Sequence, residues 1–256
     1  MAVVTFTTDF GPTDGYAAAM KGVVLSMAPD AVLVDISHNI PRHDVAAGAM
    51  ALAQATPFFP PGSVHVAVVD PGVGGARADM VVETDGAVFI GPDNGLLSMA
   101  ARPPRKAFRI ENPGFRREPA SPTFHGRDVF AVAAGKIAAG AAAQEVGSSL
   151  PDIMELAATN DGPLASECRG RVVHIDSFGN LLTSLVGGRC HGLWQLVCNG
   201  SGFDLAGGRT FSEVAPGALV LFEGSSGHME IAVRDGSAAI VTGARPGSSL
   251  ELRRQS

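Results

Sequence analysis

The segment Val64–Arg77, VHVAVVDPGVGGAR, decides how the rest of the chain is interpreted. Its first six residues, Val64–Val69, are apolar apart from His65 and mostly β-branched, which predicts a strand buried on both faces. Asp70 follows where that strand must end, and a Pro-Gly turn comes next. Ligands of open α/β sheets bind at the carboxyl ends of strands, and glycines let a ligand approach the backbone. Asp70 is therefore a candidate site carboxylate; an aspartate that caps the turn is the alternative.

The composition is that of a core-forming protein without a strong positive charge. Of the 256 residues, 46% are hydrophobic and 17% are charged, and the net charge is −6. This argues against a nucleic-acid binder that relies on counterion release and against a basic membrane-surface protein. No apolar run reaches the roughly 18 residues of a membrane span, and no basic leader opens the chain. We expect a cytoplasmic enzyme that binds neither nucleic acid nor membrane.

The spacing of residues along the chain indicates neither a metal site nor a nucleotide-binding loop. The three cysteines, Cys168, Cys190 and Cys198, are widely spaced and form no C-x-x-C pattern, unlike a disulfide framework or a zinc ribbon. Side chains of ligand-forming type are Asp9, Asp14, His38, His43, His65, Asp70 and His125. None of them falls in an H-E-x-x-H or comparable spacing, and the glycine-rich loop lacks both the phosphate-loop and the dinucleotide-binding patterns. We expect no metal and no cofactor.

The first part of the chain alternates strand and helix patterns. Predicted strands are Ala2–Thr7, Ala31–Ile36, Val64–Val69, Met80–Glu83, Ala87–Gly91 and Ala107–Ile110. Predicted helices are Gly15–Met27, which Thr13 or Asp14 would cap, a helix from Asp44 through Ala55, Leu96–Ala100 and Val129–Ala142. This order predicts an α/β domain with a mostly parallel central sheet and right-handed crossovers.

The pattern changes near Asn160-Asp161-Gly162-Pro163. We place a linker at residues 158–167, between an α/β domain of residues 1–157 and a smaller domain of residues 168–256. Short strands follow at Arg169–Ile175, Leu181–Leu185, Leu193–Val197, Gly217–Phe222, Met229–Val233 and Ala238–Thr242. Their close spacing, with glycine, serine and asparagine between them, predicts an all-β, barrel-like domain.

Three polar residues of the first domain lie at element boundaries beside glycines: Asp70, Arg77 and His125. A carboxylate, a guanidinium and an imidazole around one water molecule could polarise it and hold it in line for attack. Considered alone, Arg77 could also be an exposed surface residue, and His125 could also be a residue at the start of a helix.

Six ordered segments resemble the S-adenosyl-L-methionine (SAM) hydroxide adenosyltransferases, the water-using relatives of the fluorinase and the chlorinase. The segments are Thr7–Gly11, Val69–Gly74 with Arg77, Gly91–Leu96, Thr123–Asp128, Ile175–Asn180, and Ser225–Gly227 with Glu230–Ala232. They cover both predicted domains, and six motifs in order are far more specific than any one of them.

The resemblance implies a role for residues in both domains. Asp9 resembles the carboxylate that accepts hydrogen bonds from the ribose hydroxyls. Asp176 and Asn180 resemble the pair that holds the amino-acid end of the methionine. The implied adenine pocket and its neighbourhood contain Phe211, Ser225, Ser226 and Glu230. Asp70, Arg77 and His125 match the triad of the hydroxide-using branch. The family also implies a homotrimer in which SAM lies between one subunit's α/β domain and a neighbour's β domain.

The resemblance favours water over halide as the nucleophile. The halogenases carry Tyr at the position of Asp70, whose carboxylate would repel a halide, and the fluorinase has Ser at the position of Gly126. Leu182 and His43 replace tryptophans of the fluorinase, so the wall around the methionine departs from it. The implied reaction is metal-independent hydrolysis of SAM to adenosine and L-methionine by in-line attack on ribose C5′, with Asp70 or His125 as the base. A protein that only binds SAM or adenosine and a weak halogenase are the alternatives.

Overall fold

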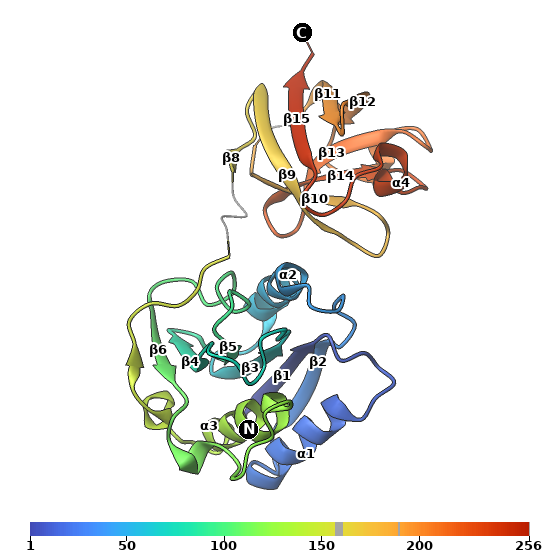
Figure 1. The fold of residues 1–256 in the computed structure, drawn as a ribbon. Coiled ribbons are helices and arrows are strands. Elements are labelled where there is room, and N and C mark those ends of the chain that lie inside the picture. Colours follow the sequence, from blue (N-terminus) through green and yellow to red (C-terminus); the bar gives the residue numbers. More distant parts are fainter. Residues whose placement is uncertain (157–160, 189, 256) are drawn as a thin grey trace. The chain divides into compact units, whose positions relative to one another are not determined.

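The computed structural model describes residues 1–156, 161–188 and 190–255. The chain divides into two compact units, Met1–Leu156 and Ala157–Ser256 (Figure 1). Part of the predicted linker, residues 158–160, lies outside the described residues. Farther along it, the short strand β8 (Gly162–Pro163) pairs with β10 (Leu181–Val186) and so belongs to the second unit.

A seven-stranded sheet forms the centre of the first unit. Its strands are β1 (Val3–Thr8), β2 (Val32–Ser37), β3 (Ser63–Val68), β4 (Asp79–Thr84), β5 (Ala87–Pro92), β6 (Arg105–Arg109) and β7 (Ser149–Leu150). They lie in the order β2-β1-β3-β5-β4-β6-β7. Strands β2, β1, β3 and β5 are parallel, β4 is antiparallel to β5 and β6, and β7 is antiparallel to β6. The predicted mostly parallel sheet is confirmed, with β3 buried along its whole length.

Helices cover both faces of this sheet (Figure 1). Helices α1 (Tyr16–Met27) and α3 (Ala131–Ala138) pack on one face, and α2 (Val45–Ala55) packs on the other. Fully buried side chains such as Met20 of α1 and Phe6 of β1 fill the first interface, and Leu52 of α2 lies in the second. Each face therefore has its own apolar core.

The order of the strands reverses between β1 and β3. The chain leaves β1 toward β2 on one side, and after α2 it returns to β3 on the other side. In open α/β sheets the carboxyl ends of the strands at such a point form a crevice that binds ligands. Asp9 comes directly after β1 and Asp70 two residues after β3, so the topology brings these two carboxylates to one edge of the sheet.

One helix prediction in the first unit is wrong, and another has the wrong bounds. Leu96–Ala100 forms a series of turns, because the Asn94 side chain bonds the backbone of Val69 and Leu96 and Gly95 adopts a left-handed φ of 93°. The helix predicted over Val129–Ala142 begins earlier, as a π-helical turn, η3 (Gly126–Phe130), and α3 ends at Ala138. Short 3-10 turns occur at η1 (Thr56–Phe58), η2 (Pro113–Phe115), η4 (Ala143–Val146) and, in the second unit, η5 (Phe211–Glu213).

The second unit is a closed β-barrel, which confirms the barrel-like prediction. Besides β8 and β10, its strands are β9 (Glu167–Ile175), β11 (Gly192–Cys198), β12 (Ser201–Gly207), β13 (Leu219–Glu223), β14 (His228–Val233) and β15 (Ser249–Arg254). Seven of them follow the order β14-β13-β12-β11-β15-β9-β10, and pairing of β10 with β14 closes the ring. Trp194, Leu196, Leu221 and Ile231 lie in its core.

The segment Ala238–Thr242 is a short helix, α4, and not the predicted strand. Ser237 caps it by accepting a hydrogen bond from the backbone N–H of Ile240 at 3.2 Å. Gly243 ends it in the left-handed region with φ of 64°. These two caps outweigh the β-branched content of the segment. No helix within the described ranges has the length and apolar character that crossing a bilayer requires.

Candidate active site

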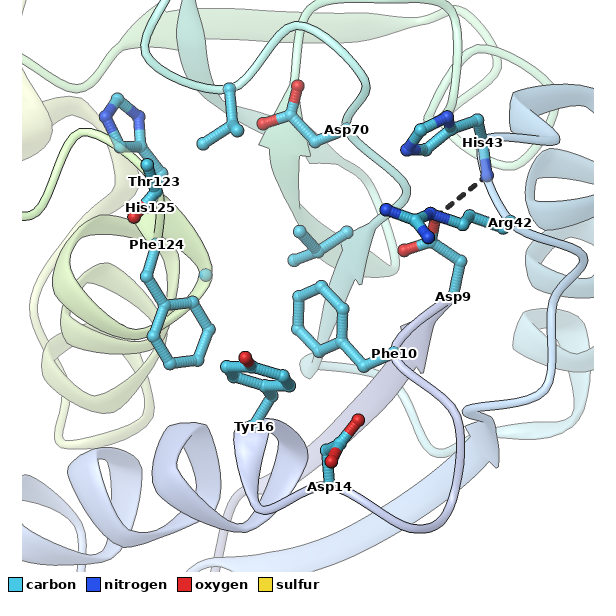
Figure 2. A pocket seen from close by; sticks show the side chains of 13 residues that line it. Asp9, Phe10, Asp14, Tyr16, Arg42, His43, Asp70, Thr123, Phe124 and His125 are labelled. Carbon is cyan, nitrogen blue, oxygen red and sulfur yellow. Dashed lines mark hydrogen bonds between the residues drawn. The ribbon is translucent and has the colours of Figure 1, made fainter.

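A cavity of about 440 Å³ opens at the carboxyl ends of β1 and β3 (Figure 2). It is lined by Asp9, Phe10, Asp14, Tyr16, Arg42, His43, Val68, Asp70, Val73, Thr123, Phe124, His125 and Gly126. These residues come from the loops after β1, β2 and β3, from the segment Thr123–Gly126, from the end of β3 and from the start of α1. Asp9, Asp70 and His125, which the sequence proposed for the site, therefore share one cavity.

Asp70 forms a two-pronged ion pair with Arg77. Its Oδ1 accepts from Nε of Arg77 at 3.0 Å and its Oδ2 accepts from Nη2. Nη1 of Arg77 donates to Asp79, and the guanidinium lies over the ring of Phe130, 5.6 Å from its centroid. Burial lowers the pKa of Arg77, but the hydrogen bond to Asp70 and the charges of Asp79 and Asp70 outweigh it and raise the pKa overall. Arg77 is a permanent cation held by two carboxylates.

His125 completes this cluster. Its Nδ1 lies 3.0 Å from Oδ1 of Asp79 and 3.3 Å from Nη2 of Arg77. Asp70 and His125 line the cavity, whereas Arg77 and Asp79 are not among the lining residues. The predicted triad thus meets in space, with Arg77 linking the two groups that face the cavity.

Sequence reasoning missed Asp79. It is the first residue of β4, its side chain is 11% exposed, and it contacts both Arg77 and His125. One feature of the sequence could have pointed to Asp79: it is a charged residue two positions after Arg77, and it directly precedes the buried run Met80–Val82. A carboxylate so close to a candidate site arginine is a plausible partner for it.

The glycine-rich loop packs against the segment that carries His125. Gly74 has a left-handed φ of 74°, and a Cβ there would collide with the carbonyl oxygen of Pro122. Only glycine meets both conditions without strain. The close approach holds Arg77, at the end of this loop, beside His125.

Asp9 is held by the loop before α2. Its Oδ2 accepts from the backbone N–H of His43 at 2.9 Å (Figure 2), which leaves Oδ1 for a ligand. His43 has φ of 65°, a conformation uncommon outside glycine and frequent at functional sites. Asp44 caps α2 as predicted, by accepting from the N–H of Ala47 at 2.9 Å. The predicted cap of α1 is wrong: Gly15 precedes that helix, and Asp14 lines the cavity instead.

An aromatic wall closes another side of the cavity. Tyr16 and Phe124 have ring centroids 5.2 Å apart, and Phe10 lies 5.8 Å from Tyr16 and 5.9 Å from Phe124. Gly126 sits tightly behind this wall, because a Cβ there would lie 3.1 Å from Sδ of Met20 and 3.2 Å from the Phe124 ring. No pattern in the sequence groups these three rings, because Phe124 is far along the chain from Phe10 and Tyr16.

The second unit brings together three of the other candidates. Oδ1 of Asp176 accepts from the backbone N–H groups of Phe178 and Asn180, and Oδ2 accepts from Nδ2 of Asn180, each at 2.9 Å. Glu230 lies opposite Leu182 on the neighbouring strand. Burial, with the charge of Asp176, raises the pKa of Glu230. The three side chains form a polar cluster where β9 passes into β10.

Phe211 and the Ser225-Ser226 turn also belong to the second unit. Phe211 is 41% exposed and stacks edge-on against Phe222 at 4.8 Å. Ser226 has a buried Oγ without a hydrogen bond to any described residue, and Ser225 is exposed in the same turn. Among the residues that the structure describes, no group of three or more His, Cys, Asp or Glu side chains could hold a metal ion.

Comparison with known proteins assigns the family. The N-terminal domain model of the SAM hydroxide adenosyltransferases matches residues 4–147, and the C-terminal domain model matches residues 170–251. An (R)-S-adenosyl-L-methionine hydrolase from Thermus thermophilus is 39% identical over 98% of this chain and 100% of its own length. A fluorinase from Nocardia brasiliensis is 27% identical over 98% of this chain and 96% of its own.

A crystal structure of an uncharacterized conserved protein from Thermotoga maritima has a TM-score of 0.90 and 29% identity, covering 98% of this chain and 100% of that one. Both domain models, the hydrolase over its full length and the fold of both units agree with the six motifs of the sequence. The chain belongs to the SAM hydroxide adenosyltransferase family.

Proposed function

We propose that this protein hydrolyses SAM to adenosine and L-methionine by attack of water on C5′ of the ribose. The observation that carries the proposal is the buried cluster of Asp70, Arg77, Asp79 and His125, of which two members line the cavity. A protein that only binds SAM has no need of such a cluster. Membership of the family and the name of the Thermus relative support the same reaction.

The cavity suits a sulfonium substrate. The carboxylates of Asp9 and Asp14 and the aromatic wall line it, and both kinds of group attract a cation. Oδ1 of Asp9 would accept from a ribose hydroxyl. In the second unit, Asp176 and Asn180 would hold the amino-acid end of the methionine, with Glu230 beside them. Phe211, Ser225 and Ser226 would contact the adenine, which would give the buried Oγ of Ser226 a partner.

The reaction is a displacement at carbon. The water oxygen forms a bond to C5′, the C5′–S bond breaks, and its electron pair stays on sulfur as the neutral thioether of methionine leaves. The water loses one proton to Asp70 or His125. Because a hydroxide-like oxygen and a sulfonium lose charge as they approach, a site that excludes bulk water favours the transition state. The substrate's own leaving group needs no acid.

We also propose a homotrimer, a cytoplasmic location and catalysis without a cofactor, as the resemblance implies. Native mass spectrometry tests the assembly: a trimer mass supports it, and a monomer at micromolar concentration contradicts it.

The Thermus relative's name specifies the R form of SAM. We propose the same preference here. In a sample that contains the R and S forms of SAM, faster turnover of the R form than of the S form would support it.

The decisive experiment uses EDTA-treated protein and SAM in ¹⁸O-labelled water, with mass spectrometry of the nucleoside. Adenosine with the heavy oxygen at the 5′ position establishes attack by water at C5′ without added metal. Bound but unchanged SAM would favour the binding-only alternative. Formation of 5′-chloro-5′-deoxyadenosine at saturating chloride would favour the halogenase, and activity that returns only with a divalent ion would reveal a metal site.

A further inference from the structure

Asp79 is the one member of the buried cluster without an assigned role. It starts β4, where its position is held on both sides: Asp79 pairs with Pro92 of β5, and its backbone carbonyl accepts from the N–H of Ile110 at 2.9 Å. Its side chain is 11% exposed. The sheet therefore holds the backbone that carries this carboxylate.

The contact of Asp79 with His125 determines which ring nitrogen carries the proton. An ionised carboxylate only accepts hydrogen bonds, so Nδ1 of His125, 3.0 Å from Oδ1 of Asp79, must be the donor. The competing contact, from Nη2 of Arg77 to Nδ1, is longer at 3.3 Å, and Nη2 already donates to Asp70. Of the two neutral tautomers of His125, Asp79 thus favours the one with its hydrogen on Nδ1.

That tautomer leaves the lone pair on Nε2. Nε2 makes no hydrogen bond to any described residue, and His125 lines the cavity. Both oxygens of Asp70, in contrast, already accept from Arg77. A water molecule in the cavity would find an unoccupied acceptor on His125 and a charge-neutralised carboxylate on Asp70.

We infer that Asp79 is a positioning residue that holds His125 with the proton on Nδ1, so that Nε2 takes the proton of the attacking water. The consequence for turnover rests on the proposed function. As the O–H bond breaks, its electron pair enters the O–C5′ bond, and the proton adds to the Nε2 lone pair. The imidazolium that forms lies against the carboxylate of Asp79, and Asp70 orients the water. The same division of labour operates in Ser-His-Asp enzymes.

The first test needs no substrate. Long-range ¹H–¹⁵N spectra of the full-length protein with ¹⁵N-labelled histidine distinguish a protonated from an unprotonated ring nitrogen, and His125→Gln identifies the signals. We expect protonated Nδ1 and unprotonated Nε2 in the wild type. An Asp79→Asn variant can turn its amide NH₂ toward Nδ1, so we expect the proton to move to Nε2. Wild-type protein with the proton on Nε2 would overturn the inference.

The second test measures turnover. We expect Asp79→Asn to lower kcat by about 100-fold or more, since positioning groups and general bases contribute at this level, with little change in KM. Glu83→Gln, at the other end of β4, is the matched control and should retain both the tautomer and the rate. Unchanged kcat in a folded Asp79→Asn would contradict the inference. If the wild type releases no labelled adenosine, the proposed function fails, and the spectra still decide the role of Asp79.

Discussion

Arg77 is a cation with 10% of its side chain exposed, and it stays charged because Asp70 and Asp79 surround it. Removing one partner of such a buried group leaves uncompensated charge, which is costlier than an exposed ion pair. Variants of this cluster should therefore keep an acceptor atom if their effects on rate are to be interpreted. Asp70→Asn meets this requirement better than Asp70→Ala.

We expect Asp70→Asn to lose turnover while it still binds SAM. The amide oxygen can accept from Nε of Arg77, but the amide NH₂ replaces the second carboxylate oxygen, which accepts from Nη2 of Arg77 and, in the proposed mechanism, helps to orient the water. A fall in kcat of about 100-fold or more is expected for a group that acts on the water. Single-turnover rates and calorimetric binding measure the two effects. Asp85→Asn, in the β4–β5 turn, is the control; equal rates in both variants would remove Asp70 from the mechanism.

His65 illustrates a residue of ligand-forming type that belongs to the core. It is 1% exposed on β3, its Nδ1 lies 2.8 Å from Oγ1 of Thr5, and it stacks against Phe59 and Phe89. Burial lowers the pKa of His65 from 6.5 to about 4. Below pH 6.5 the unfolded chain therefore binds a proton that the folded chain refuses. The stability that neutral His65 contributes is fully present above pH 6.5 and is lost as the pH falls toward 4.

We expect this residue to account for about 2–3 kcal/mol of the stability lost between pH 7 and pH 4.5, at 1.36 kcal/mol per pH unit. His65→Gln, which can still bond Thr5, should show a shallower decline in the free energy of unfolding measured with urea. His191→Gln changes an exposed histidine and should follow the wild type. Parallel curves for wild type and His65→Gln would show that His65 does not titrate in this range.

At the scale of elements, the glycine-rich loop is the most sensitive part of the site. We expect Gly74→Ala to lower stability by about 1–3 kcal/mol, because alanine must adopt a left-handed φ and its Cβ collides with the Pro122 carbonyl. If the segment around Pro122 moves to relieve this collision, it displaces His125, and kcat falls. Thermal unfolding and the rate of adenosine release measure both. Gly86→Ala, where a Cβ meets nothing within 4 Å, is the control, and equal behaviour of the two would show that the loop tolerates a side chain.

Elements with a strong apolar or β-branched pattern could be predicted from the sequence, and those decided by caps or by distant partners could not. The composition of Val64–Val69 sufficed for β3, and strand–helix alternation sufficed for the parallel sheet. Strand β12 (Ser201–Gly207) has no such pattern, since four of the seven residues in its sequence SGFDLAG are polar or glycine. It is a strand because β11 pairs with its whole length. In β15, the alternation of Leu250 and Leu252 was an available signal that was missed.

The residues of the candidate site also divide into those that the sequence could predict and those that it could not. Asp70 could be proposed from its place after a buried strand. Arg77 and His125 could be singled out with it because each lies at an element boundary beside glycines. That the three side chains meet, and the roles in the second unit, rested on the resemblance, because contacts between distant segments leave no local pattern. Asp79 and the aromatic wall of Phe10, Tyr16 and Phe124 became visible only when the chain was folded.

At the scale of the whole molecule, each unit has its own apolar core. We expect Leu196→Ala, at a fully buried position of β11, to raise hydrogen exchange across the barrel and to leave exchange in residues 1–156 near the wild-type level. Hydrogen-exchange mass spectrometry of the full chain reports both units at once. Leu52→Ala, in α2, should give the reciprocal pattern, and equal acceleration in both units would show that they unfold together.

The closure of the barrel through β10 and β14 limits how copies of this chain can associate. Within the seven-stranded ring, each described strand has a partner strand on both sides, although β12 pairs with β13 only at Ala206 and Gly207, so no strand of the ring is an edge strand with one side wholly unpaired. We therefore expect copies that meet through this ring to recognise one another mainly by surface side chains and loops. Single substitutions can strengthen or weaken such contacts, or change the partner surface that they bind, without disturbing the backbone hydrogen bonds of the barrel. The quaternary structure can therefore evolve independently of the fold.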